Sequence, residues 1–413
     1  MTAVKAHVWT FRSQFRAGAF GWRSDLPIKR IKEAVAEIKK AARKDEVLAA
    51  DGAVIFLEKV SGALAQVDSS SGAIGTAVNR AIETLVPVIA QAPATHRLRD
   101  KWLDRLWRAI EDDDIPYIEL LPDHWGEMCV TPERASGWAD RFIEAVRMTW
   151  SPDLPRGGYF KGTAACLSAL YAGGRHEDLL NLLDLSPYKF WHDRRWGVRA
   201  LVAQGKIMAA LQYAEDTRGP NQPGSQISEA CEEILLSEGL WREAYDQYAL
   251  EANRRSTYLA TFQAMTTKYP QIAPKTILVD LIDGTPGDEG KWFAAAKSAG
   301  LLTEAAELAQ RCLCDPRTLT RATRDFAASH PDFARSVGMA ALKWLLCGYG
   351  YDLTAQDVAN ALNHTLEAAR NEGSEADTML SIQQLIEQHP GADRTIVALM
   401  RRKLDDTTKS SAS

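Results

Sequence analysis

Four glycines recur in the middle of the chain, each after a helical pattern that ends in small residues. They are Gly174, Gly205, Gly239 and Gly300, separated by 31, 34 and 61 residues, and the last gap is about two periods. A period of this length is typical of helical repeats, in which each repeat is a pair of helices joined by a turn. One such pair cannot bury its apolar faces alone, so neighbouring pairs must stack. The spacing therefore predicts a helical solenoid with an extended concave surface.

The remaining sequence also favours an all-α fold, because no sustained alternation of apolar and polar residues marks a strand. We expect a basic N-terminal helical domain over residues 1–150, a repeat array with a C-terminal cap over residues 158–400, and a disordered tail over residues 401–413. The boundary is placed at SPDLPRGG, residues 151–158, where two prolines and two glycines fall within eight residues.

Composition excludes several classes of protein. Hydrophobic residues make up 46% and charged residues 25% of the chain, as in ordinary globular proteins. No apolar run is long enough for a membrane helix, the N-terminus lacks the apolar stretch of a signal peptide, and the six cysteines are scattered. We therefore expect a cytoplasmic protein with free thiols and no membrane partner. No metal-binding, dinucleotide or nucleophile motif occurs, so no metal and no cofactor is expected.

Charge is distributed unevenly along the chain. Residues 1–44 carry eleven Lys or Arg against three acids, a charge of +8, although the whole chain carries −5. The remaining residues therefore carry −13. A basic end on an acidic body is expected where one region meets a polyanion. The alternative is a basic helix that docks on an acidic partner or on its own domain.

The basic residues lie in two segments. In FRSQFRAGAFGWR, residues 11–23, arginines alternate with Phe11, Phe15, Phe20 and Trp22. The following amphipathic helix places Lys29, Lys32, Lys39, Lys40 and Arg43 within a sector of about 100°. Cations of this kind neutralise phosphates, and an exposed aromatic ring can stack on a base. The nucleic-acid-binding residues predicted from both segments are Arg16, Trp22, Arg23, Lys32, Lys39, Lys40 and Arg43. The alternative is a solvated charged face with aromatic residues in an ordinary core.

A second anion site is predicted at DSSSG, residues 68–72, just before another amphipathic helix. Backbone N–H groups at a helix start, together with serine hydroxyls, can hold a phosphate. Ser70, Ser71 and Gly72 are the residues expected to supply these donors. The alternative is that Ser70 or Ser71 simply caps the helix.

Two carboxylates are candidates for chemistry. Glu58 lies on a helix that is apolar nearly all round, and burial favours the protonated form of a carboxyl group. Asp68 begins the predicted anion site ten residues later. Together they could position a water or stabilise a positively charged sugar intermediate. The alternatives are that Glu58 is a partly exposed helix residue or pairs with a lysine, and that Glu46 is the acting acid. A further cluster, Trp191 and Trp196 with Arg194 and Arg195, could face a groove.

The strings AGGRHEDLLNLL, SEGLWREAYDQYAL and SAGLLTEAAELAQ resemble tetratricopeptide-like repeats over roughly residues 158–330. That resemblance implies a concave face that binds protein segments. The chain also resembles a group of bacterial proteins of unassigned activity that carry the strings GAFGWRS and VDSSSGAIGTAVN. A more distant analogy is to HEAT-like DNA glycosylases, including antiphage enzymes. This analogy implies DNA held on a basic concave surface, with Trp22 beside a flipped base and Glu58 as the acid.

The sequence thus predicts a nucleic-acid-binding helical-repeat protein, in the most specific form a DNA glycosylase that excises modified bases. DNA is the expected partner, held by the N-terminal basic face. The alternative is a scaffold without catalytic activity that presents the repeat groove to a protein partner.

Overall fold

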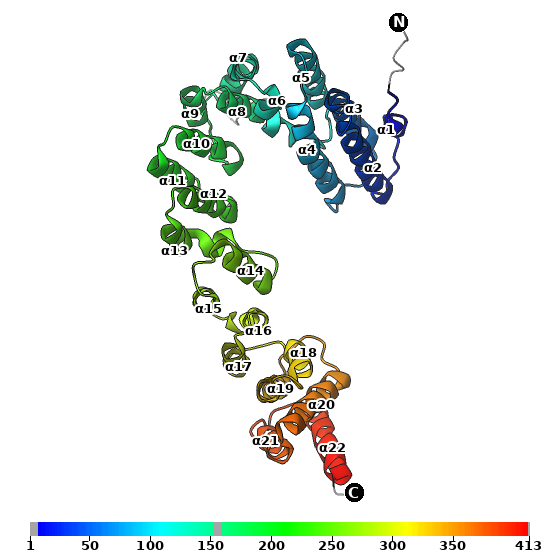
Figure 1. Ribbon diagram of the computed structural model, residues 1–413, viewed down its shortest axis with the longest axis vertical. Helices are drawn as coiled ribbons and strands as arrows, with labels where there is room; N and C mark the ends of the chain where they lie inside the picture. The colour runs from blue at the N-terminus through cyan, green and yellow to red at the C-terminus, as the bar shows by residue number, and fades with distance from the viewer. Residues whose placement is uncertain (1–6, 152–157, 412–413) are drawn as a thin grey trace. The chain divides into compact units, whose positions relative to one another are not determined.

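The computed structural model describes residues 7–151 and 158–411, with side chains as far as Asp405. Within these ranges it contains 22 α-helices, two short 3-10 helices and no strand (Figure 1). The predicted all-α class is therefore confirmed. The chain forms two compact units, residues 1–223 (unit 1) and residues 224–413 (unit 2), which are described separately.

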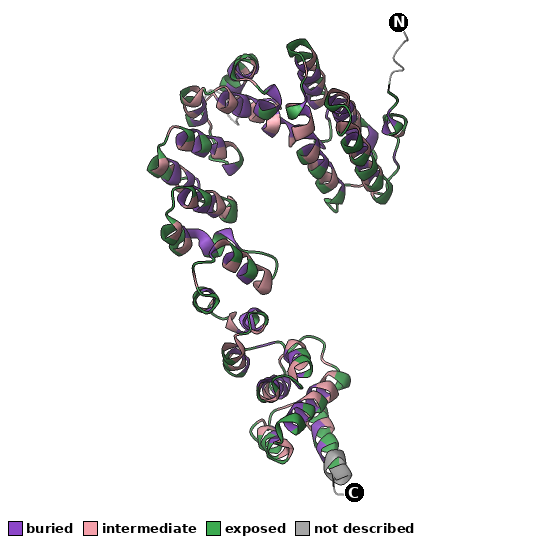
Figure 2. Cartoon of the chain, viewed as in Figure 1, coloured by how far each residue is buried: buried purple, intermediate pink, exposed green. Residues whose placement is uncertain are grey.

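Unit 1 contains helices α1 to α11 and one hydrophobic core that extends from Trp9 to Ala200. The helices are Thr10–Gln14 (α1), Asp25–Ala42 (α2), Glu46–Leu64 (α3), Ala73–Gln91 (α4), His96–Glu111 (α5), Leu121–His124 (η1), Trp125–Cys129 (α6), Pro132–Thr149 (α7), Thr163–Ala172 (α8), His176–Asp184 (α9), Trp191–Ala203 (α10) and Ile207–Glu215 (α11). Buried residues lie on the sides of the helices that face neighbouring helices (Figure 2).

Unit 2 contains helices α12 to α22. They are Gly224–Ser237 (α12), Trp241–Ala252 (α13), Tyr258–Lys268 (α14), Pro274–Asp283 (α15), Glu289–Trp292 (η2), Phe293–Ser298 (α16), Leu302–Arg311 (α17), Pro316–Phe326 (α18), Pro331–Leu346 (α19), Ala355–Glu372 (α20), Glu375–Glu387 (α21) and Arg394–Ser411 (α22). One core lies between residues 249 and 344, and a second lies between residues 342 and 404. Consecutive helices therefore bury their apolar residues against near neighbours in the chain.

The boundary between the units differs from the predicted one. It follows Pro223, in the connection between α11 and α12, and not the segment at residues 151–158, of which residues 152–157 lie outside the described ranges. Helices on both sides of that segment share a core: the N–H of Gly126 donates to Ser168 Oγ at 3.0 Å. A Cβ at Gly126 would lie 2.4 Å from the Ser168 carbonyl oxygen. The local composition predicts a domain boundary at residues 151–158, but the helices on both sides of this segment pack into one core.

The four glycines of the sequence pattern do mark helix turns. Gly174, Gly205, Gly239 and Gly300 have φ between 70° and 76°, the left-handed region that favours glycine. In each turn the residue after the glycine donates a backbone hydrogen bond back into the helix, as Lys206 does to the Leu201 carbonyl at 2.9 Å. These bonds satisfy carbonyls that the helix end would leave open. Each glycine therefore ends one helix of a pair and begins the next.

Helices α2 and α4 have the apolar faces that the sequence predicted. Ile31 and Ile38 of α2 are buried against α3 and α4. In α4 the apolar positions Ile74, Val78, Ile82, Leu85 and Ile89 are all fully buried. Within the described ranges α4 is also the one helix whose length and apolar composition would suffice to cross a membrane, but core helices have the same properties. Its packing against α2, α3 and α6 identifies it as a core helix of unit 1.

The C-terminal tail is more ordered than expected. Helix α22 continues to Ser411, and Leu404, inside the stretch expected to be disordered, is 2% exposed. Residues 412–413 lie outside the described ranges. Among the cysteines, burial raises the pKa of Cys129, Cys166 and Cys314 to about 12, so these thiols stay protonated at neutral pH.

Candidate nucleic-acid interface

Two loops that are distant in sequence are joined at the end of α3. The N–H of Gly18 donates to the Gly62 carbonyl at 2.9 Å, and the N–H of Asp68 donates to the Trp22 carbonyl at 2.9 Å. Gly18 adopts a positive φ of 62°, which lets the chain turn before Trp22. The structure therefore brings the predicted residues Trp22 and Asp68 side by side.

The aromatic residues of this segment divide between core and surface. Phe11, Phe15 and Phe20 are buried, and Phe11 and Phe15 both meet Phe56 of α3 edge to face. Trp22 is 71% exposed. Only Trp22 among these aromatic side chains is thus available to stack on a ligand.

The predicted cations of α2 lie opposite its buried stripe. We call Lys29, Lys32, Lys39, Lys40 and Arg43 the basic face of α2; all five are exposed. Neither these residues nor Arg16 and Arg23 form an ion pair with any residue of the described ranges. Two of the three acids of α2 are engaged with other groups, because Glu33 pairs with Arg30 at 2.7 Å and Glu37 accepts the Thr10 N–H at 2.8 Å. The positive charge of this face is therefore not neutralised by ion pairs within the described ranges.

The DSSSG loop is closed by its own hydrogen bonds. Asp68 Oδ1 accepts the Ser70 N–H at 2.9 Å, and the Gly72 N–H donates to the Ser69 carbonyl at 2.9 Å. Gly72 is the N-cap residue of α4, with φ at 69°, and Ser71 Oγ lies 3.4 Å from the Ala73 nitrogen. Two predicted phosphate donors, the N–H groups of Ser70 and Gly72, are thus already in use. The hydroxyl-bearing residues Ser70 and Ser71 remain exposed.

Asp68 is held in its charged form. The backbone N–H and then the hydroxyl of Ser70 lower the pKa of Asp68 below its ordinary value. A carboxylate at this position repels a phosphate placed in the same loop, and it attracts a cation. Asp68 is thus suited to stabilise positive charge, not to act as a proton donor.

Glu58 is paired with an arginine, and not with the lysine of the alternative above. Arg105 of α5 donates to both of its oxygens, with Nε to Oε1 and Nη2 to Oε2 each at 2.6 Å. The same guanidinium donates to Asp51 at 3.1 Å, and Trp102 Nε1 donates to that same Asp51 oxygen. Glu58 raises the pKa of Arg105 through this hydrogen bonding. Glu58 and Asp68 share no partner, so the structure does not combine them into one site, and Glu46 is an exposed residue in the first turn of α3.

The cluster around α10 is a core feature and includes a carboxylate that the sequence analysis did not find. Trp191, Trp196 and Arg194 are buried, and Arg194 lies over the Tyr213 ring at 3.7 Å. Arg195 pairs with the buried Asp123 at 2.8 Å, and His192 lies 3.3 Å from the same oxygen. Asp123 follows Pro122 in η1, and its spacing from α10 gives no sequence signal for the pairing.

Charge interactions are mutual in this cluster. Burial by itself would raise the pKa of Asp123, but His192 and Arg195 lower it below the ordinary value. Asp123 in turn raises the pKa of His192. Nowhere in the described part of the chain do three or more His, Cys, Asp or Glu gather as metal ligands would.

The fold defines an all-α protein whose paired helices are compatible with a helical-repeat protein. Comparisons with protein-family models, curated proteins and solved structures find no match for this chain. The residues themselves must therefore carry any argument about function.

Proposed function

We propose that the protein binds nucleic acid through a surface of unit 1 made of the basic face of α2 with Arg16, Trp22 and Arg23. Two observations carry this proposal: these cations form no ion pair within the described ranges, and Trp22 is 71% exposed. The basic face spans about 21 Å of helix axis, which matches about six phosphates along one strand. A row of cations of this length can contact several phosphates at once, so it suits a polyanion better than it suits one acidic residue.

The first experiment reverses two charges of this face. Lys39→Glu with Lys40→Glu should weaken binding to a DNA duplex by about a hundredfold. The double substitution should also make the dependence of affinity on salt concentration shallower, by the equivalent of about two phosphate contacts. Arg401→Glu with Arg402→Glu is the matched control, because it makes the same charge change on exposed positions of α22 in unit 2. Equal binding by the two double variants would refute this assignment of the surface.

Base excision is the stricter form of the proposal. Asp68 is the carboxylate best placed for it, because it lies next to Trp22 and is ionised, as stabilisation of a positively charged sugar requires. The test incubates the full chain with normal and base-modified duplex DNA and measures alkali-sensitive strand breaks. Breaks that disappear in Asp68→Asn support excision. DNA retardation without breaks would leave a binding protein only. Glu58→Gln should act through the Arg105 pair and change stability.

The second candidate function is a protein-binding scaffold. It is favoured by the repeated helix pairs, for which we infer a tetratricopeptide-like solenoid: α8 and α9 pack against α10, and α16 and α17 form a further pair. A solenoid of this kind needs no catalytic group. A scaffold should capture one defined protein, ignore DNA, and keep that partner in the Lys39→Glu, Lys40→Glu variant. DNA retardation that weakens steeply with salt would favour the first function.

A further inference from the structure

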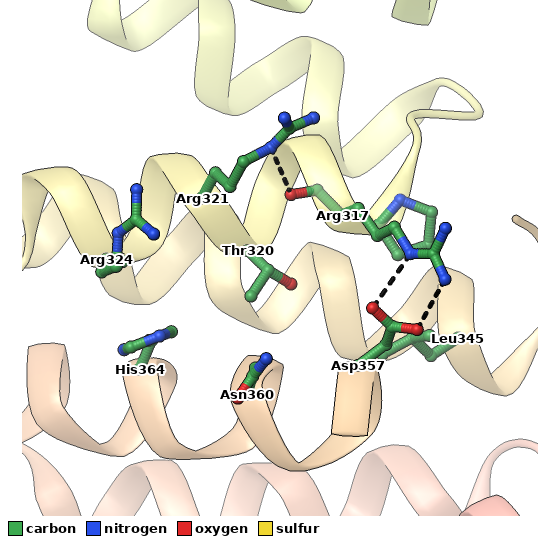
Figure 3. A pocket seen from close by; sticks show the side chains of 9 residues that line it. Arg317, Thr320, Arg321, Arg324, Leu345, Asp357, Asn360 and His364 are labelled. Carbon is green, nitrogen blue, oxygen red and sulfur yellow. Dashed lines mark hydrogen bonds and ion pairs between the residues drawn. The ribbon is translucent and has the colours of Figure 1, made fainter. Parts of the chain in front are cut away.

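Unit 2 contains a basic cavity that the proposed function does not use. Helix α18 packs against α20, and between them lies a cavity of about 270 Å³ (Figure 3). Arg317, Thr320, Arg321 and Arg324 line it from α18, at spacings of three, four and seven residues that place them on one helix face. The opposite face of α18 carries the buried residues Leu319, Ala322 and Thr323. The arginines are therefore directed away from the core by the same amphipathic pattern that anchors the helix.

Facing these residues, α20 supplies a carboxylate, an amide and an imidazole. They are Asp357, Asn360 and His364, again on a single helix face (Figure 3). Asp357 is already committed, because Arg317 donates to both of its oxygens at 2.9 and 2.8 Å and the Thr354 N–H donates to it at 2.8 Å. This pairing with Arg317 holds the pKa of Asp357 well below its ordinary range. Asp357 thus fixes the Arg317 guanidinium and is not itself a free acceptor.

Arg321 and Arg324, unlike Arg317, are not held by a carboxylate of α20. Arg321 donates only to the Arg317 carbonyl and the Thr318 hydroxyl, each at 3.2 Å, and it forms no ion pair within the described ranges. Arg324 pairs with its sequence neighbour Asp325 at 2.8 Å, but both side chains are about half exposed, and such surface pairs are weak. Counting three arginines and one aspartate, the lining carries a charge of +2.

We propose that this cavity binds a small phosphate monoester, with the phosphate held by Arg321 and Arg324 and oriented by Thr320 and Asn360. A phosphate monoester carries −1.5 to −2 charges at neutral pH, which matches the charge of the lining. Guanidinium groups bind phosphate oxygens through paired hydrogen bonds, and hydroxyl and amide groups supply the neutral donors that fix orientation. The cavity lies near the lower end of the usual size range of ligand sites, so it suits a sugar-sized ester.

The test is calorimetric titration of the full chain with ribose 5-phosphate, and with ribose as the uncharged control. We expect binding of one ribose 5-phosphate per chain and no binding of ribose. Arg321→Gln with Arg324→Gln should raise the Kd at least about tenfold, because each guanidinium contributes charged hydrogen bonds. Arg401→Gln with Arg402→Gln removes the same charge from exposed positions of unit 2 and should leave the Kd unchanged.

A third variant separates a built site from general attraction of anions. Thr320→Val removes a neutral donor and no charge, and it should weaken ribose 5-phosphate binding about threefold or more. The proposal is overturned if ribose 5-phosphate fails to bind at millimolar concentration, if the control pair weakens binding as much as the cavity pair, or if Thr320→Val has no effect. All of these variants leave the basic face of α2 intact, so the outcome is independent of nucleic-acid binding.

Discussion

Residues 11–23 and residues 188–197 of unit 1 interleave aromatic and basic residues in similar ways. The arginines of the first segment stay on the surface, whereas those of the second reach into the core. In residues 11–23 the phenylalanines are buried, whereas Trp22 and the arginines remain exposed. In residues 188–197 both tryptophans and Arg194 are buried, and Arg195 reaches the buried Asp123. The difference depends on what lies opposite each arginine. A cation becomes part of the core where a buried carboxylate or ring receives it, and it stays available to a ligand where none does.

The largest effect is expected when one tryptophan of each segment is replaced by alanine. Trp196 is 5% exposed, so Trp196→Ala should lower the free energy of unfolding by about 4 kcal/mol through the cavity that it leaves. Trp22→Ala should change it by less than about 0.5 kcal/mol, but it should weaken binding of single-stranded DNA by about 1–3 kcal/mol. Denaturant titration and fluorescence binding measure the two effects. Similar losses of stability would break the comparison.

The second test removes the charge that receives Arg195. Asp123→Asn leaves Arg195 and His192 beside a neutral group, and it should lower the free energy of unfolding by about 3 kcal/mol. Asp25→Asn, at an exposed position in the first turn of α2, is the matched control and should be close to neutral. Chemical denaturation of both variants provides the measurement. A neutral Asp123→Asn would mean that the pair contributes nothing to the core.

A third test compares two glycines within the first segment. Gly18 has a positive φ, whereas Gly21 does not, and neither would bring a new Cβ within 4 Å of another atom. Gly18→Ala should therefore cost about 1 kcal/mol of stability by backbone strain alone, and Gly21→Ala should cost little. Thermal unfolding of the two variants checks the difference. Equal melting temperatures would show that the loop before Trp22 relaxes without cost.

The smallest effect is the pH dependence of the His192 and Asp123 pair. Because Asp123 raises the pKa of His192 in the folded state, the stabilisation is complete below the ordinary pKa of histidine and is lost as pH rises through the raised value. The loss should be about 0.5 kcal/mol, since the His192 side chain is about half exposed. His192→Gln should remove this part of the pH profile of unfolding. A profile that the substitution leaves unchanged would contradict the pairing.

Local patterns in the sequence predicted much of the fold. The left-handed turns at Gly174 and Gly205 and the buried stripe of α4 follow from spacing within one or two helices. The site depends on contacts across tens of residues, and local patterns do not specify these. Arg105 lies 47 residues from Glu58, and no periodicity connects them. The same limit applies to residues 151–158: their proline and glycine content predicts a boundary, although the helices that flank them share a core.

The backbone hydrogen bond between Asp68 and Trp22 affects how tightly a ligand that stacks on Trp22 can be bound. A tryptophan on a mobile loop must lose conformational entropy when it stacks on a partner, and that loss reduces affinity. Here the Trp22 carbonyl is fixed to a second loop, and Gly18 is fixed to the end of α3, so the ring is presented from a backbone that is already ordered. Preorganisation of this kind should appear as slow amide hydrogen exchange at Asp68 and Gly18 before any ligand is added.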